Sequence, residues 1–372
     1  MSRLTVGVVF GGRSVEHEVS LLSATSVIRN VDPGKYDVFP IFIEKSGIWR
    51  KASVSAWLDE GGIEFFEDSF LSPSLNPGKP VFYEITGKKI VKEHAVDVIF
   101  PVLHGTHGED GAIQGLFELM GLAYVGASVL GSSVGMDKIA MKSLLRDRGL
   151  PVIEFLGFYK SEWVAGKEKL RERILKEIGL PCFVKSANLG SSVGITKVTS
   201  ESELDAAVDY SCRFSESVIV ERAVRKPREI EVSVLGNDDP QASCPGEVIP
   251  HREFYDYTAK YLEEGTGLIA PAELDEETSA KLRDFAVRTF RALHCSGMGR
   301  VDFLLEEGTN DIFVSEINTI PGFTKISMYP RLWEVSGLSF PELVNRLIEL
   351  AIERRRQADS LESDYSDIGV KD

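Results

Sequence analysis

The sequence is poor in the residues that build disulfide frameworks and zinc sites. Only four cysteines and six histidines occur among 372 residues. The cysteines are widely spaced and form no CxxC or mixed Cys/His pattern; they are Cys182, Cys212, Cys244 and Cys295. Scattered cysteines of this kind are typical of reduced intracellular proteins. We therefore expect a cytoplasmic protein without structural zinc.

Long apolar runs and an excess of basic charge are also missing. No segment approaches the roughly 20 apolar residues that a membrane-spanning helix needs, and the first apolar run, residues 4–10, is too short for a signal-peptide core. Aspartate and glutamate number 57 against 42 lysines and arginines, a net charge of −15. Nucleic-acid binding needs a basic surface. The sequence predicts neither a membrane nor a nucleic acid as partner.

Two common nucleotide-binding fingerprints are absent. The glycine turn FGGRSVEH, residues 10–17, is not GxGxxG, and no GK[ST] follows the later glycine-rich loop to open a helix. A dinucleotide-dependent dehydrogenase is therefore disfavoured. A chain of 372 residues with 43% hydrophobic residues exceeds the usual single-core size, so two or three packed domains are expected.

Strands and helices alternate over the first 125 residues or so. Apolar runs at 4–10, 36–44 and 96–105 predict strands, and residues 15–28 and 112–121 predict helices. This alternation favours a doubly wound parallel sheet, which binds ligands beyond the carboxyl ends of its strands. Residues 46–95, which contain a small hairpin at 82–92, are expected to form an insertion on that sheet.

Polar residues gather where two of these strands end, at 11–18 and 104–111. Glu16 and Glu18 fall in the first turn of a helix, where a carboxylate can act in a site or simply favour the helix dipole. His104 ends a buried run and is either a site residue or a hydrogen-bonded core histidine. The pattern alone does not decide between a site role and a structural role, either for the glutamates or for His104.

A second unit begins with a helix predicted at 136–151. Residues 180–198 follow as strand, Gly/Ser-rich loop and strand, so that backbone amides, serine hydroxyls and Lys185 can surround a polyphosphate. A merely flexible turn is the alternative. A strand ending at Glu221 precedes an alternating strand, 229–236, that contains Glu229.

The aromatic segment 251–267 contains three tyrosines, Phe254 and Lys260 but few aliphatic residues, which is typical of an ordered lid; a protein-contact patch is the alternative. Helices are expected at 277–295 and 340–356, and the polar, acidic tail after residue 357 is expected to be disordered.

The stretch from 299 to 327 is the most informative. Runs at 301–305 and 311–318 flank the turn EEGTN and predict a hairpin. Alternation of side chains places Glu316 and Asn318 on one face with Asp302 opposite Glu316. The other face is expected to enter a core through three apolar residues, Phe303, Phe313 and Ile317.

Two carboxylates and an amide oxygen suit Mg²⁺ or Mn²⁺ better than zinc. Arg300 lies two residues before Asp302, and a Pro-Gly turn (Pro321, Gly322) follows Asn318. A cation, metal ligands and a bendable backbone fit a site where negative charge develops. The alternative is a surface hairpin whose acidic residues face water.

Seven strings then occur in the order found in one family. They are GGRSVEHEVS (11–20), LHGTHGEDG (103–111), MDK (136–138), VKSANLGSSVGI (184–195), FYDYTAKY (254–261), GRVDF (299–303) and EINTIPGFTKISMYP (316–330). With them the chain, from residue 4 to about 355, resembles the D-alanine:D-alanine ligases of the ATP-grasp superfamily. The resemblance implies an α/β and α+β fold, with an N-terminal doubly wound parallel sheet followed by a two-part ATP-grasp domain.

The resemblance also implies domains and partners. The domains are an N-terminal substrate domain at 1–130, a central ATP-grasp subdomain at 131–222 and a C-terminal subdomain at 223–357, followed by the tail at 358–372. The reaction uses ATP to convert one D-alanine into an acylphosphate that the amine of a second D-alanine attacks. Two Mg²⁺ ions are implied, with Mn²⁺ as an alternative, and so is a homodimer.

Site roles follow from the same resemblance, residue by residue. Glu16 holds the ammonium of the first D-alanine and is linked to Ser191 and Tyr261; His104 frames that pocket. ATP phosphates are contacted by Lys138, Lys185, Ser192 and Lys260, and the adenine and ribose by Glu221 and Glu229. Asp302, Glu316 and Asn318 hold the metal ions. Arg300 and the Gly322 amide stabilise the oxyanion, and Ser327 binds the second carboxylate.

Other functions remain to be distinguished. Tyr261 favours an amine acceptor, whereas a D-alanine:D-lactate or D-alanine:D-serine ligase is the alternative within the same chemistry. A non-catalytic ATP-binding sensor of the same fold is the alternative from another class. Ala223 departs from the family, because some members carry a tryptophan there beside the adenine.

Overall fold

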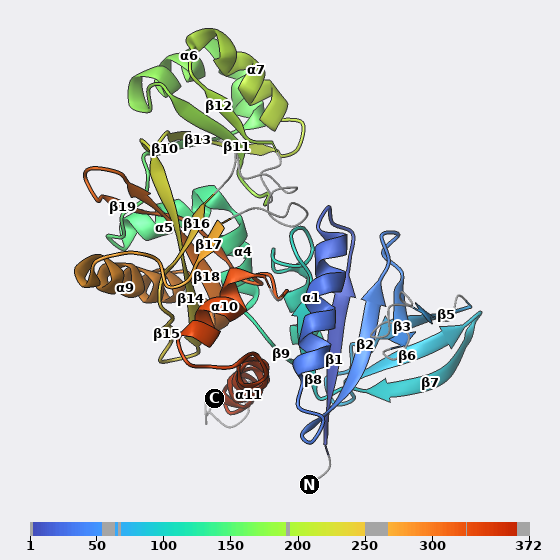
Figure 1. Cartoon of the computed structure of the whole chain (residues 1–372). Helices are drawn as coiled ribbons and strands as arrows, with labels where there is room; N and C mark the ends of the chain where they lie inside the picture. The colour runs from blue at the N-terminus through green and yellow to red at the C-terminus, as the bar shows by residue number, and fades with distance from the viewer. Residues whose placement is uncertain are drawn as a thin grey trace, which may run out of the picture.

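The computed structural model describes residues 3–53, 64–65, 68–190, 194–249, 267–324 and 326–362. Figure 1 shows three bodies: an N-terminal sheet with its insertion in blue, a small green body at the top, and a yellow-to-red body beside them. Each is built around its own β-sheet.

The N-terminal sheet has the strand order β4-β3-β2-β1-β8-β9. Its centre is parallel, because β1 pairs in parallel with β2 and β8, and β8 with β9. The predicted parallel sheet is thus confirmed, with β3 and β4 added antiparallel. The strands are β1 (Leu4–Gly11), β2 (Tyr36–Ile43), β3 (Trp49–Ser53), β4 (Glu64–Phe65), β8 (Val98–Val102) and β9 (Ala123–Tyr124).

Both faces of this sheet are covered. One face packs against α1 (His17–Asn30) and α11 (Phe340–Asp359), with Val8 and Phe10 in the shared core. The other, which includes Val9, packs against α3 (Ala112–Met120) and a second small sheet. That sheet is β5 (Ser69–Pro73), β6 (Val81–Thr86) and β7 (Lys89–Ala95). The predicted insertion therefore includes β3, which belongs to the main sheet, as well as the hairpin.

The green body is a four-stranded antiparallel sheet in the order β10-β13-β11-β12. Its helices α6 and α7 lie on its outer side (Figure 1) and share its apolar core. The elements are β10 (Phe155–Tyr159), α6 (Lys160–Glu177), β11 (Cys182–Ser186), β12 (Thr196–Val198), α7 (Glu201–Ser211) and β13 (Ser217–Arg222).

The third large sheet has the order β17-β16-β14-β18-β19, with β15 also paired to β14. One face packs on α9 and on residues of α5 (Lys138–Asp147) through Met141, Phe290 and Phe303. The elements are β14 (Pro227–Gly236), β15 (Gln241–Ala242), β16 (Gly246–Ile249), β17 (Gly267–Ile269), α9 (Glu276–Ala292), β18 (Gly297–Glu306), β19 (Ile312–Asn318) and α10 (Met328–Val335).

The helix expected at 136–151 is interrupted at its start. α4 (Val129–Met136) ends just before Asp137, and α5 (Lys138–Asp147) begins just after it. The Asp137 carboxylate accepts hydrogen bonds from the amides of Ile139 and Ala140, which caps α5. This aspartate therefore fixes the direction in which the first lysine of α5 leaves the helix.

One predicted core residue, Phe313, lies on the wrong face for that prediction. A β-bulge shifts the register between Asp302 and Phe303, so that Phe303 pairs with Val314 instead of Ser315. Ile312, Val314 and Ile317 are buried in the core, whereas Phe313 is half-buried with the Arg222 guanidinium 5.5 Å from its ring centroid. The extra residue of a bulge reverses alternation on one strand.

Helix α11 joins the C-terminal part of the chain to the N-terminal sheet. Its Arg354 guanidinium donates to the carbonyl oxygens of Tyr124 (2.8 Å) and Gly126 and to the hydroxyl of Ser296 (2.6 Å). The helix extends to Asp359, beyond its expected end, and residues 363–372 of the predicted tail lie outside the described residues. Among the described helices, none has the length and apolar character of a bilayer-crossing segment.

We expect Arg354→Met to destabilise the protein by about 3 kcal/mol, because two carbonyl groups and a hydroxyl lose a charged donor in a partly buried position. Thermal unfolding followed by calorimetry measures the change. Arg356→Met is the matched control, because Arg356 is exposed on the same helix. Equal unfolding temperatures for the two variants would contradict this role for Arg354.

Candidate active site

Three acidic side chains form a row across three neighbouring strands. Glu231 on β14 lies opposite Asp302 on β18, which lies opposite Glu316 on β19. The predicted pairing of Asp302 with Glu316 is confirmed. Arg300 lies opposite Asn318 in the same ladder, and the Asn318 side-chain amide donates to Asp302 Oδ2 at 2.9 Å. The hairpin therefore brings its proposed metal donors together on one face.

Arg300 is fixed by two carboxylates on this face. Its Nε and Nη2 atoms each lie 2.7 Å from an Asp302 oxygen, a bidentate pair, and Nε is 3.0 Å from Glu231 Oε2. Bidentate pairs hold a guanidinium in one orientation. The guanidinium plane is thus set before any substrate is bound, as a group that stabilises developing negative charge must be.

Lys138 connects the hairpin to the Gly/Ser loop. Its ammonium nitrogen lies 3.4 Å from Glu316 Oε2 and donates to the carbonyl oxygen of Leu189 at 2.9 Å. Leu189 immediately precedes Gly190, at the start of the loop. One side chain, placed by the Asp137 cap, therefore spans the two segments that sequence analysis assigned to metal and phosphate.

A buried charge cluster surrounds Glu221, the residue near the end of β13. Lys185 on β11 lies 2.6 Å from Glu221 Oε2, and Lys142 on α5 lies 2.8 Å from Glu221 Oε1. Burial raises the pKa of Glu221, but the two ammonium groups outweigh it and lower that pKa to about 2. Burial lowers the pKa of Lys185, but the carboxylates of Glu221, Glu316 and Glu229 raise it by more, so that it is raised overall. Glu221 and Lys185 are therefore charged at neutral pH.

Glu16 lies between the N-terminal sheet and the Gly/Ser loop. It precedes α1, is 7% exposed, and its side chain makes no capping hydrogen bond to that helix within the described residues. A Cβ atom at Gly105 would come within 2.6 Å of Glu16 Oε2, and one at Gly190 within 3.9 Å of it. Glu18 instead pairs with Lys45 at the surface. Of the two glutamates, Glu16 is the one directed into the site.

Glu16, Gly105 and Gly190 form one corner of the site. His104 and Glu109 attach this corner to the loop that follows β19. The carbonyl of Ile320 accepts from His104 Nδ1 at 3.0 Å, which leaves Nε2 to accept from the Ser23 hydroxyl at 3.3 Å. Glu109 accepts from the amides of Gly105 (2.9 Å) and Ile320 (3.1 Å). Burial lowers the pKa of His104 although Glu16 raises it, so the neutral imidazole is favoured.

The loop after β19 is compact around Gly322. A Cβ atom there would lie 2.8 Å from the Ser327 hydroxyl oxygen, which also accepts from the Thr324 amide at 3.0 Å. Ser327 precedes α10. Gly322 and Ser327, predicted to bind the oxyanion and a carboxylate, are thus neighbours. Four other predicted site residues lie outside the described residues: Ser191, Ser192, Lys260 and Tyr261.

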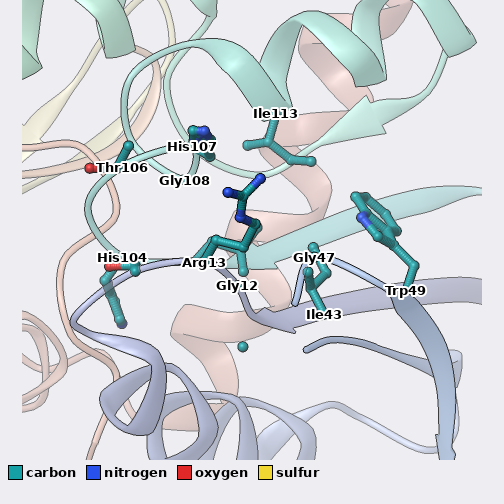
Figure 2. Close-up of a pocket in the computed structure, with 13 residues that line it drawn as sticks. Gly12, Arg13, Ile43, Gly47, Trp49, His104, Thr106, His107, Gly108 and Ile113 are labelled. Atoms are coloured by element: carbon teal, nitrogen blue, oxygen red, sulfur yellow. The ribbon is translucent and has the colours of Figure 1, made fainter. Parts of the chain in front are cut away.

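A cavity of about 150 Å³ lies beside this corner, at the ends of β1, β2 and β8. Figure 2 shows the Arg13 side chain pointing toward Ile113 and His107, with Trp49 across the pocket. His104 and Gly12 contribute to the lining, but Glu16 does not. The cavity therefore adjoins the predicted first-substrate corner without including its carboxylate.

The donor set of the hairpin fits a hard divalent cation. Asp302, Glu316 and Asn318 supply carboxylate and amide oxygens, the ligands that Mg²⁺ prefers. Within the described part of the chain, no group of three His, Cys, Asp or Glu side chains forms a metal cluster. Any ion here therefore needs the amide oxygen of Asn318 and further oxygens from a phosphate.

Three residues of the site, Glu109, Lys142 and Glu231, were not predicted from the sequence. Glu231 was included only as part of the alternating strand at 229–236. Glu231 carried a signal, because strand alternation places it on the face of Glu229. Lys142 follows Lys138 by four residues and so shares its helix face. Glu109 lies in a polar loop where its partners, Gly105 and Ile320, cannot be inferred from spacing, since Ile320 is 211 residues away.

Comparison with known proteins gives a consistent result. A family model described as D-ala D-ala ligase N-terminus matches residues 5–127, and one described as D-ala D-ala ligase C-terminus matches residues 144–349. The D-alanine--D-alanine ligase of Natranaerobius thermophilus is 44% identical over 367 residues, 99% of this chain and 100% of the relative. That of Acetivibrio thermocellus is 45% identical over 93% of this chain and 95% of its own.

Solved structures agree. The D-alanine-D-alanine ligase of Coxiella burnetii superposes with a TM-score of 0.82 at 37% identity, covering 96% of this chain and 97% of its own. The VanG D-Ala:D-Ser ligase of Enterococcus faecalis superposes with a TM-score of 0.83 at 36% identity, covering 94% and 100%.

The Glu109 carboxyl predicts a pH dependence of stability. Burial, and next the Glu16 carboxylate, raise the pKa of Glu109 to about 8. Between its ordinary pKa near 4.5 and 8, the folded protein holds more protons than the unfolded chain, so stability falls as pH rises through this window. In the wild type, this lowers the free energy of unfolding by on the order of a few kcal/mol in total. Glu109→Gln should flatten the decline.

Urea unfolding at several pH values between 5 and 9 measures the slope. Glu109→Gln also leaves one backbone amide without its carboxylate acceptor, so the slope, not the absolute stability, is compared. Glu172→Gln, at an exposed position, is the control and keeps the wild-type slope. Identical slopes in wild type and Glu109→Gln would show that Glu109 is ionised throughout.

Proposed function

The chain belongs to the D-alanine–D-alanine ligase family, and from this premise we propose how its residues divide the work of the reaction. The protein is an ATP-dependent ligase that joins two D-alanines into D-alanyl-D-alanine for peptidoglycan precursors. The observation that carries this function is family similarity over the full length of the chain. The observation that carries the division of roles is the cross-strand row of Asp302 and Glu316 beside Arg300.

The first step phosphorylates a carboxylate. An oxygen of the first D-alanine attacks the γ-phosphorus of ATP, the bond to the β-phosphate breaks, and ADP leaves. Two anions repel unless cations lie between them, so positive charge must cluster at this point. Lys138 from α5 and Lys185 from β11 contact the phosphates, together with Ser192 and Lys260. Glu221 and Glu229 contact adenine and ribose.

Divalent metal ions belong to this family's chemistry, and here they neutralise phosphate charge when bound. Asp302, Glu316 and Asn318 would hold them. We propose two Mg²⁺ ions, which Mn²⁺ can replace, as the resemblance to the family implies; the two carboxylates can each bind a separate ion.

The second step forms the peptide bond. The amine of the second D-alanine attacks the acyl carbon, the carbon–oxygen bond to phosphate breaks, and phosphate leaves with a proton lost from the amine. Arg300, held bidentately by Asp302, and the Gly322 amide stabilise the oxyanion. Ser327, next to Gly322, binds the carboxylate of the second D-alanine.

The first D-alanine is held at the corner between the N-terminal sheet and the Gly/Ser loop. The Glu16 carboxylate binds its ammonium group, with Ser191 and Tyr261 as hydrogen-bonding partners, and neutral His104 frames the pocket. Supporting this, Glu16 is directed toward Gly105 and Gly190 and is not used as a helix cap.

The larger organisation is also a proposal. We assign residues 1–130 to substrate binding, 131–222 to the central ATP-grasp subdomain and 223–357 to its C-terminal partner, with 358–372 as a tail. Because ATP and D-alanine are its substrates, we place the enzyme in the cytoplasm. The resemblance to the family suggests a homodimer.

ADP release should depend on D-alanine and be matched by D-alanyl-D-alanine detected by mass spectrometry. Parallel reactions with D-alanine plus D-serine or D-lactate test the acceptor. A dominant mixed dipeptide or ester would reassign the second substrate. ATP binding without any D-alanine-dependent ADP would instead favour the sensor.

Glu316→Gln should lower kcat by about 100- to 1,000-fold, the range seen when one electrostatic contact to a transition state is lost. Mn²⁺ binding measured by electron paramagnetic resonance should weaken in parallel. Glu307→Gln, exposed in the turn of the same hairpin, is the control. Normal turnover with normal Mn²⁺ affinity in Glu316→Gln would remove this residue from the metal site.

A further inference from the structure

Helix α5 directs two lysines into the site, and only the first has a role so far. Lys138 and Lys142 are four residues apart and therefore share one helix face. Lys142 is 1% exposed, whereas most lysines keep their ammonium group in water. Its nitrogen lies 2.8 Å from Glu221 Oε1 and 3.5 Å from the Val314 carbonyl oxygen. A lysine enclosed to this degree needs a specific reason.

The two lysines around Glu221 are not equivalent. Lys142 is enclosed, whereas the Lys185 side chain is 17% exposed. Each binds a different oxygen of the carboxylate. Lys185 can therefore turn toward a ligand while Lys142 cannot, so Glu221 has one permanent partner and one exchangeable partner.

We propose that Lys142 is a positioning residue for the nucleotide: it holds the Glu221 carboxylate in place so that Lys185 can leave it for an ATP phosphate. This rests on the proposed nucleotide roles of Lys185 and Glu221. Without Lys142, moving Lys185 to the phosphate would leave Glu221 a buried, unpaired carboxylate, which is strongly unfavourable. With Lys142, Glu221 keeps a cation and its Oε2 atom can accept a hydrogen bond from the adenine amino group.

The surroundings of Lys142 support a fixed position. Val314, whose carbonyl faces the ammonium group, forms a β-bridge with Val152, and its amide donates to the Pro151 carbonyl at 2.8 Å. Lys142 therefore lies where β19, which carries Glu316, meets the chain entering the four-stranded sheet. Burial lowers the pKa of Lys142, and Glu221 opposes this shift. Glu221 therefore favours the charged ammonium form of Lys142.

Lys142→Met, which keeps the side-chain length and removes the charge, should raise the KM for ATP about tenfold or more, the equivalent of one charged hydrogen bond. The KM for D-alanine should stay within about twofold, because its corner is built from other elements. Arg146→Met is the matched control, because Arg146 is an exposed cation on the same helix. An unchanged KM for ATP, or equal losses for ATP and D-alanine, would overturn the proposal.

A double-mutant cycle separates positioning from folding. If Lys142 acts through Glu221, then in a Glu221→Gln background Lys142→Met should change ATP affinity by no more than about twofold. The double variant buries no unpaired carboxylate, so it serves even if Lys142→Met alone fails to fold. If Lys142→Met changed ATP affinity equally in the wild-type and the Glu221→Gln backgrounds, the proposal would be overturned.

ADP binding by isothermal titration calorimetry measures the nucleotide affinities of the double-mutant cycle. This binding needs no D-alanine, so it tests Lys142 even if wild-type protein forms no dipeptide, an outcome that would count against the proposed function alone.

Discussion

The acidic face of the β14–β18–β19 sheet depends on the cations that reach it. Glu231, Asp302 and Glu316 lie in register on adjacent strands, where like charges directly opposite one another are destabilising. Arg300 bridges the first two, and Lys138 approaches the third from another element. The row of carboxylates is therefore stabilised by Arg300 within the sheet and by Lys138, which the fold brings to it on α5. The same arrangement concentrates both signs of charge where a phosphoryl group has to be transferred.

A second constraint connects the N-terminal sheet to this face. The segment after β19 is held by Ser23, His104 and Glu109, which bind backbone groups of Phe323 and Ile320. All three side chains are buried or nearly so, and their partners are main-chain atoms. The position of Gly322 relative to Glu16 is thus fixed by hydrogen bonds, not by side chains of the loop itself. The acyl group of a substrate bound between Glu16 and Gly322 therefore contacts groups whose positions are already fixed.

Local patterns in the sequence were sufficient for part of this site. Alternation and the EEGTN turn predicted that Asp302 faces Glu316, because register in a short hairpin follows from turn position. The same rule failed for Phe313, because a bulge adds one residue to a strand without leaving a mark in the pattern. Glu109 and Lys142 were not found, since their roles depend on partners contributed by distant segments. Burial of a lysine on a helix with polar neighbours becomes visible only when β13 and β19 are in place.

The ion pairs around the site share one physical principle. Lys138, Lys185 and Arg300, the cations proposed to meet phosphate and oxyanion, each pair with an acidic residue proposed to bind metal or base: Glu316, Glu221 and Asp302. When a metal–nucleotide complex binds, these charged side chains exchange one charged partner for another. No unpaired charge is buried, which avoids most of the desolvation cost of isolated ions. Exchange works only if each carboxylate stays paired while its cation moves. Asp302 keeps Arg300, which stays bidentate on it, and Glu221 keeps Lys142 while Lys185 moves.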